Sequence, residues 1–284
     1  MKFFLLTLIF VINVSANATA ITTIGKQKPD DASHDYFIGL LQLVLTETSS
    51  EYGKAEIKIV PHPGQERVMK FLEEGSYFDV AWSGSSSKRE EKLLKVSFPL
   101  FKGGLGWRGS IIKKDNVNKF SSIKGIGDMQ NEIACQGAHW PDADILEEAG
   151  LTVYRVGHFD AMLQMVELQR CDYLPLSIFE GQAELDLVQK SFPNLIFYQQ
   201  LIIKYALTMN FFVNIKSKVL AQRLELGLLK LHLNGKFDQY MRNNKLTKAA
   251  FPLDKYKNSQ VLQLNNNTIK DKALAKYGLR WLND

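Results

Sequence analysis

The sequence predicts an α/β protein with two lobes, each a mixed, mostly parallel sheet flanked by helices. Short runs of apolar and β-branched residues alternate with stretches of helical periodicity, as expected when helices connect parallel strands. This alternation occurs in residues 20–82 and again in 110–206, with a glycine-rich stretch between them. The chain has 284 residues, 45% of them hydrophobic, which is long enough for two domains of ordinary size.

The first lobe is expected to open with a β-branched strand and a helix. Ser33 is a candidate cap for this helix, because apolar residues recur at helical spacing from Phe37 to Thr48. The motif Pro-His-Pro-Gly at 61–64 ends the strand before it. Strands are predicted at 20–25, 55–60 and 78–82, and helices after Ser33, at 65–74 and at 87–94.

The second half of the chain continues the alternation and then returns to the first lobe. Strands are predicted at 110–113, 132–136, 152–156, 173–176 and 195–198, and helices at 142–149, 159–168 and 179–191. A further strand is predicted at 205–213, followed by helices at 219–233 and 237–242 and by a closing helix at 271–281.

The N-terminus is typical of a secretory signal peptide covering residues 1–18. Lys2 precedes an apolar run at 3–14, and Ala16 and Ala18 supply the small-x-small cleavage pattern. The alternative is a membrane anchor, but a spanning helix needs about 20 apolar residues. We therefore expect cleavage near Ala18 and a mature protein in the periplasm.

Charge and cysteine content restrict the function further. The net charge of +5 comes from scattered lysines and arginines, which are usually solvated, so we expect no nucleic-acid partner. Cys135 and Cys171 show no CxxC spacing. An oxidising compartment would permit one disulfide, but each cysteine also falls on an expected buried strand, where a free thiol is common. Both alternatives remain open at this point.

Seven short motifs follow one another in a fixed order. They are FDV at 78–80, SSKRE at 86–90, VSFPL at 96–100, IIKKD at 111–115, SSIKG at 121–125, EIACQG at 132–137 and GKFD at 235–238. Together they make the mature chain resemble a divergent branch of the family 3 solute-binding proteins of bacterial periplasm, which have the bilobed type II fold.

The resemblance implies a domain division and a place for the ligand. Lobe 1 would comprise 19–109 and 207–284, and lobe 2 would comprise 110–206. Two hinge strands, near 108–110 and 205–208, would connect them. The ligand would lie in the cleft between the lobes, which agrees with the general rule that α/β sheets bind ligands beyond the carboxyl ends of their strands.

In lobe 1 the resemblance assigns ligand contacts to Trp82, Ser83 and Ser85, at the end of the third strand. The alternatives are that Trp82 belongs to the core and that Ser86 only caps the following helix. Arg108 would bind a ligand carboxylate as a bidentate donor. It stands one residue before the position of the family's arginine, which falls on Gly109. On a strand this reverses the side-chain direction unless a bulge in the glycine-rich run absorbs the shift. The alternative is a surface charge beside the hinge.

In lobe 2 the resemblance assigns Gly137 to a ligand contact through its N–H at a helix N-terminus. The hydroxyl residue usual at the next position is missing, so His139 and Trp140 are further candidates. Asp142 and Asp144 would stabilise the helix but weaken an anion site.

The lobe 2 strand at 173–176 carries the clearest departure from the family pattern. Amino-acid-binding relatives carry an aspartate that pairs with the ligand ammonium at the position of Ser177, and Glu180 is the residue that could replace it. A standard α-amino acid is therefore not the expected ligand.

These observations favour a monomeric, exported solute-binding protein that closes by a hinge on a small polar or zwitterionic molecule. Its partner would be an ABC-type permease, or, as an alternative, a membrane sensor. A cyclohexadienyl-dehydratase-like enzyme is a further alternative, with Glu180, Asp79 and His139 as candidate groups. The motifs GxSxG, HExxH and GxxxxGK[ST] are absent, so we expect no enzyme, metal or cofactor. His62 and His158 are interpreted as isolated loop histidines.

Overall fold

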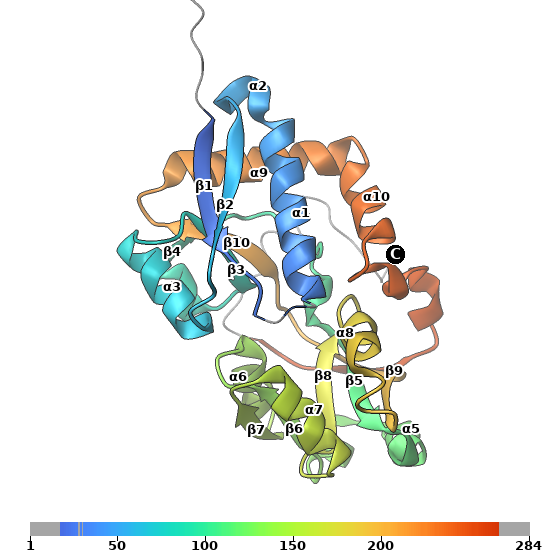
Figure 1. Ribbon diagram of the computed structural model, residues 1–284. Coiled ribbons are helices and arrows are strands. Elements are labelled where there is room, and N and C mark those ends of the chain that lie inside the picture. Colours follow the sequence, from blue (N-terminus) through green and yellow to red (C-terminus); the bar gives the residue numbers. More distant parts are fainter. Residues whose placement is uncertain (1–17, 28, 30, 267–284) are drawn as a thin grey trace, which may run out of the picture.

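A computed structural model describes residues 18–27, 29 and 31–266, arranged as two lobes one above the other (Figure 1). The predicted helix at 271–281 and the signal peptide up to residue 17 lie outside these residues. The strands are β1 Thr19–Ile24, β2 Ala55–Val60, β3 Val80–Gly84, β4 Leu93–Lys95, β5 Trp107–Lys113, β6 Ile133–Gly137, β7 Thr152–Val156, β8 Tyr173–Ser177, β9 Leu195–Lys204, β10 Met209–Asn214 and β11 Gln260–Gln263. The helices are α1 Ala32–Glu47, α2 Ser49–Tyr52, α3 Gln65–Glu74, α4 Ser87–Glu90, α5 Val117–Ser122, α6 Pro141–Glu148, α7 Phe159–Glu167, α8 Gly181–Val188, α9 Lys218–Leu233 and α10 Lys236–Asn243. The predicted alternation of strands and helices is confirmed.

The first lobe contains a parallel pair, β1–β2, and an antiparallel sheet in the order β3-β10-β4. Side chains join the two: the Thr22 N–H donates to Asp79 Oδ2 at 2.7 Å, and the Thr23 hydroxyl donates to the Val80 carbonyl at 2.8 Å. Helices α1 and α9 pack together on this lobe. The polar residue Asp79, which interrupts the apolar run before β3, therefore serves to hold β1 beside β3.

Two local predictions in this lobe were wrong. Asp31, and not Ser33, caps α1, because its Oδ1 accepts the N–H of His34 at 2.9 Å. The helix expected at 87–94 ends at Glu90, because Leu93–Lys95 forms β4 and pairs with β10. Ser86 does cap α4, as predicted, by accepting the N–H of Arg89.

The second lobe is a mixed sheet of six strands in the order β11-β9-β5-β8-β6-β7. Strand β5 is antiparallel to both β8 and β9, whereas β6 is parallel to β7 and β8. Strand β11 pairs with β9 in this sheet, although the sequence placed residues 260–263 in lobe 1. The remaining lobe boundaries stay a prediction.

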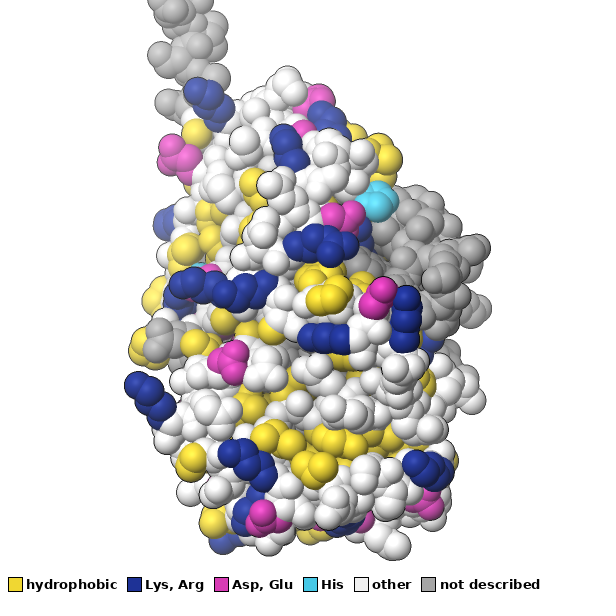
Figure 2. All heavy atoms as spheres, turned by 90° about the vertical axis from the view of Figure 1, so that its right-hand side faces the viewer, with side chains coloured by type: hydrophobic (Ala, Val, Ile, Leu, Met, Phe, Trp, Pro, Cys, Tyr) yellow, Lys and Arg dark blue, Asp and Glu magenta, His cyan; other side chains and the backbone are white. Residues whose placement is uncertain are grey.

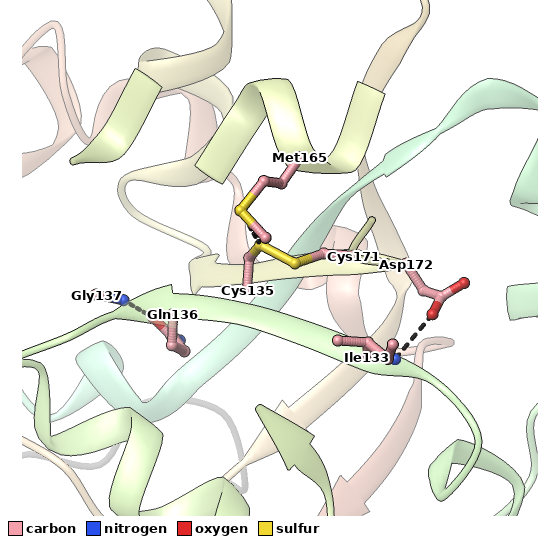
Figure 3. The surroundings of a disulfide bond; sticks show 7 residues. All are labelled: Ile133, Cys135, Gln136, Gly137, Met165, Cys171 and Asp172. Carbon is pink, nitrogen blue, oxygen red and sulfur yellow. Dashed lines mark hydrogen bonds between the residues drawn. A yellow bond between two sulfur atoms is a disulfide. The ribbon is translucent and has the colours of Figure 1, made fainter. Parts of the chain in front are cut away.

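A disulfide joins Cys135 on β6 to Cys171 just before β8, with their Cα atoms 5.6 Å apart (Figure 3). The same strand ends are tied by Asp172, whose Oδ2 accepts the Ile133 N–H at 2.8 Å. The Met165 sulfur, from α7, lies 3.9 Å from Cys135 Sγ. Of the two alternatives left open by the sequence, the structure therefore has the disulfide.

The chain passes between the lobes before β5, again between β9 and β10, and a third time between α10 and β11. The first two crossings touch: the Tyr205 N–H donates to the Gly106 carbonyl at 3.0 Å, and a Cβ on Gly106 would stand 1.9 Å from the Tyr205 carbonyl oxygen. Only glycine fits at position 106. The crossing predicted at 205–208 lies where expected, whereas 108–110 belongs to β5, where Arg108 pairs with Ser177.

Candidate ligand-binding cleft

A cavity of about 330 Å³ lies between the two lobes. This volume is at the lower end of the range for small-molecule sites. Side chains of the first lobe and of the second lobe both contribute to its wall. The lining residues that matter below are Gln27, Asp31, Ser33, Phe37, His62, Trp82, Ser83, Arg108, Trp140, Asp142, His158, Phe159, Asp160, Glu180 and Glu184.

Five of the nine residues predicted from the sequence line this cavity: Trp82, Ser83, Arg108, Trp140 and Glu180. On β3, the Trp82 ring is stacked on Phe37 at a centroid distance of 5.0 Å. The neighbouring Ser83 hydroxyl is buried and has no hydrogen-bond partner among the described residues. Trp82 thus belongs both to the core and to the cavity wall, so the two positions that the sequence offered as alternatives for it are both occupied by the same ring.

Arg108 is buried, not a surface charge, and its guanidinium is held by three groups. Its Nη2 lies 2.5 Å from Asp142 Oδ1, its Nε donates to the Tyr205 hydroxyl at 3.1 Å, and its Nη1 lies 3.7 Å from Glu180 Oε2. Burial, the largest single effect, would lower the pKa of Arg108, but Asp142, Tyr205 and Glu180 together outweigh it and the pKa is raised. The guanidinium is a fixed positive charge.

The register of Arg108 has a structural reason. A bulge between Arg108 and Ser110 shifts the pairing of β5 with β9, in the glycine-containing run that the sequence singled out. Such a bulge re-aims a strand side chain. The residue that appears one position early is thereby directed into the cavity.

Asp142 and Tyr205 were not predicted as site residues. Asp142 lies in the first turn of α6, which starts at Pro141, and its Oδ1 accepts the Tyr205 hydroxyl at 2.5 Å in addition to its contact with Arg108. The sequence assigned Asp142 only to the stability of α6. Its place directly after a proline at a helix start, facing a predicted cleft, was the signal available for a site role.

Glu180 lies at the start of α8, with its side chain 14% exposed. Burial raises the pKa of Glu180 to about 7; Arg108 opposes this shift, while Glu184 and Asp142 add to it. A carboxyl group with this pKa changes its charge close to neutral pH.

Two contacts join the lobes on either side of the cavity. The Ser33 hydroxyl on α1 donates to Glu184 Oε1 on α8 at 3.1 Å. On the other side, the Arg89 guanidinium donates to the Gly84 carbonyl at 2.7 Å and to the His139 carbonyl at 2.8 Å. The two lobes are therefore in direct contact on both sides of the cavity.

The other four predicted residues lie outside this cavity. Ser85 bonds to Asn210 at 2.8 Å and so fixes the strand after the crossing. Gly137 lies beneath the Trp140 ring, and a Cβ added to Gly137 would stand 2.5 Å from that ring. His139 is exposed and lines a second groove, to which both lobes contribute. The buried Ser177 hydroxyl donates to the Gly104 carbonyl at 3.2 Å.

His62 and His158, interpreted from the sequence as isolated, both line the cavity. The His62 Nδ1 accepts the Gly64 N–H at 3.0 Å, and its Nε2 lies 3.3 Å from Gln27 Nε2. Burial lowers the pKa of His62. Neither histidine carried a sequence signal, because the loops that hold them are distant in the chain.

Metal binding and membrane spanning find no support in the described residues. Within 18–27, 29 and 31–266, no group of three or more His, Cys, Asp or Glu side chains is placed to hold a metal ion. No helix in this part of the chain is long and apolar enough to cross a membrane. On the face drawn in Figure 2, Lys and Arg side chains are spread out with acidic side chains among them.

Comparison with solved structures defines the class of fold. The chain has the two-lobed fold of type II periplasmic binding proteins. No family model matches the sequence, and no curated protein matches it significantly.

Three of the similar structures illustrate the range within this fold. An ancestral arginine-binding protein bound to arginine has a TM-score of 0.55 at 15% identity, over 79% of this chain and 97% of that one. A histidine kinase sensor domain with similarity to periplasmic binding proteins has 0.59 at 14%, over 80% and 95%. A periplasmic His/Glu/Gln/Arg/opine family-binding protein from Silicibacter pomeroyi, in complex with lysine, has 0.58 at 13%, over 80% and 96%.

Proposed function

We propose that this chain is an exported, monomeric solute-binding protein that captures a small polar or zwitterionic molecule between its lobes. The observation that carries the proposal is the cavity, because both lobes supply its wall and the contacts on either side of it join them. A ligand that touches both lobes favours the closed arrangement, which is how hinge-closing binding proteins retain their ligands.

The disulfide supports export. Cys135 and Cys171 are linked, and such bonds persist in oxidising compartments such as the bacterial periplasm. Together with the apolar N-terminal run, this supports secretion with cleavage near Ala18. A periplasmic binding protein would deliver its ligand to an ABC-type permease.

A sensing role is the second candidate, since one of the similar structures is a histidine kinase sensor domain. Permease and ATPase genes beside this one would support transport, whereas a kinase or cyclase gene would support sensing. An enzyme is not proposed, and the absence of turnover of prephenate or arogenate by a protein that binds ligand would agree with that.

The test is a thermal-shift screen of the purified mature protein against amino acids, polyamines, organic acids and oligosaccharides. We expect at least one class to raise the melting temperature, and Trp82→Ala to abolish the rise measured against its own ligand-free melt. Tyr154→Ala is the matched control, because Tyr154 is an exposed ring on β7, outside the cavity. Full binding by Trp82→Ala would show that the cleft is assigned wrongly.

A further inference from the structure

The charges that line the cavity are unbalanced. Among the described lining residues, Arg108 is the single Lys or Arg. Five carboxylate side chains share the wall with it: Asp31, Asp142, Asp160, Glu180 and Glu184. Asp31 is already used as the cap of α1, accepting the N–H groups of His34 and Gln27. Glu184 accepts the Ser33 hydroxyl, and the remaining three, Asp142, Asp160 and Glu180, still outnumber the one guanidinium.

The positive charge of Arg108 is not free for an anionic ligand. Asp142 lies 2.5 Å from its Nη2, and Tyr205 accepts from its Nε. A ligand carboxylate could reach this guanidinium only by displacing Asp142. That would leave a buried carboxylate without its partner, which is strongly unfavourable. The protein's own Asp142 occupies the place where a ligand carboxylate would bind.

Two polar side chains in the cavity make no hydrogen bond with the described residues, although Glu180 keeps its ion pair with Arg108. Ser83 is 3% exposed, and its hydroxyl has no hydrogen bond within the described part of the chain. The Glu180 carboxylate lies 3.7 Å from Arg108 Nη1, beyond hydrogen-bond distance, and the described residues donate no hydrogen bond to it. Buried polar groups are normally satisfied, so both are available to a ligand.

Aromatic rings complete the wall. Trp82 stacks on Phe37 on the first-lobe side, and Trp140 and Phe159 belong to the second lobe. Rings beside carboxylates are the usual surroundings of organic cations, because the ring face attracts a positive charge. They also contact the apolar body that carries it.

We propose that the cleft takes a protonated primary amine on an apolar or aromatic body that bears no carboxylate. The ammonium group pairs with Glu180, and Ser83 supplies a further hydrogen bond. The amine's own charge offsets the excess of carboxylates that Arg108 cannot neutralise. This inference rests on the proposed function and narrows the polar or zwitterionic ligand to a cation.

Matched pairs of probes that differ only in the carboxylate test it. Dissociation constants of the purified protein are measured by calorimetry for agmatine and arginine, tyramine and tyrosine, and histamine and histidine. We expect at least one amine to bind, and at least tenfold more tightly than its amino acid. An amino acid that binds as tightly as its amine, or failure of all three amines to bind, overturns the inference. Binding of any other compound in the screen then still leaves the proposed function standing.

Two variants locate the discrimination. Asp142→Asn replaces the internal carboxylate by an amide of the same shape, so that Arg108 becomes available to a ligand carboxylate. The affinity for the amino acid should then rise at least tenfold relative to the affinity for the amine. If this variant does not fold, Glu180→Gln is the deciding test. It should lower the affinity for the amine at least tenfold and leave the affinity for the amino acid unchanged. Asp144→Asn is the control, since this exposed residue of α6 pairs with Arg155. Equal effects on both members of a pair would contradict the assignment.

Discussion

Ionisation of Glu180 makes the stability of the empty protein depend on pH. The pKa of Glu180 is raised by burial from 4.5 to about 7 in the folded protein. The folded state therefore binds this proton more tightly than the unfolded state does. The stability that the protonated group contributes is fully present below pH 4.5 and is lost as the pH rises through 7.

The magnitude follows from the size of the shift. Each pKa unit corresponds to about 1.4 kcal/mol, so the full shift from 4.5 to about 7 amounts to roughly 3.5 kcal/mol in the free energy of unfolding. The groups around Glu180 are Arg108 on β5, Asp142 on α6, Glu184 on α8 and the buried Tyr36 on α1. Glu184 and Asp142 favour the neutral form, and Arg108 alone favours the charged one.

The assay is urea unfolding of the wild type and of Glu180→Gln at pH 5 and at pH 8, without ligand. The variant cannot ionise at this position, so its stability relative to the wild type should rise by about 2–3 kcal/mol between the two pH values. Glu56→Gln, at an exposed position on β2, is the control for the substitution itself. An equal difference between wild type and variant at both pH values would refute the burial of Glu180 on which the site is built.

Three further predictions concern binding, the disulfide and the crossing. If an amine pairs with ionised Glu180, its affinity should fall about tenfold per pH unit below pH 7 and level off above, as measured by calorimetry; a flat profile would exclude this pairing. Replacing Cys135 and Cys171 by serine should cost about 2–4 kcal/mol in urea unfolding, and a reductant should bring the wild type to the same value. Gly106→Ala should lower the free energy of unfolding by roughly 1–3 kcal/mol, because its Cβ would stand 1.9 Å from a carbonyl oxygen of the other crossing. Gly127→Ala, with nothing within 4 Å of the added Cβ, is its control, and an equal loss in both would remove the clash as the cause.

Most of the fold could be predicted because its signals are local. Apolar periodicity located α1, α7 and α9, and the glycine-rich run before β5 located a crossing. Pairings between distant segments were less accessible. The residues at 260–263 give no local sequence signal for the sheet that they join, because their partner strand β9 lies about sixty residues earlier. Likewise, α4 ends early because of the pairing between β4 and β10, which no local propensity records.

The candidate site shows the same division between local and distant signals. Trp82, Ser83 and Arg108 end up at the cavity because they stand at strand ends or beside the crossing, where sequence order indicates a cleft. Asp142 could be seen in the sequence, but its partner could not. Because Asp142 is buried with Arg108, the variant Arg108→Ala should destabilise even the ligand-free protein, since losing one member of a buried pair costs about 3–5 kcal/mol.

The burial of Glu180 also connects ligand charge with closure. Glu180, Glu184 and Asp142 all belong to the second lobe, so closing leaves their mutual repulsion unchanged. What closing adds is the first-lobe wall of Trp82 and Ser83 over the cavity, and burial is the largest cause of the raised pKa of Glu180. A cation bound beside Glu180 offsets the cost of burying its charged form, whereas an anion increases that cost. A positively charged ligand therefore stabilises the closed arrangement more than the open one, and that difference is what a hinge requires in order to respond to its ligand.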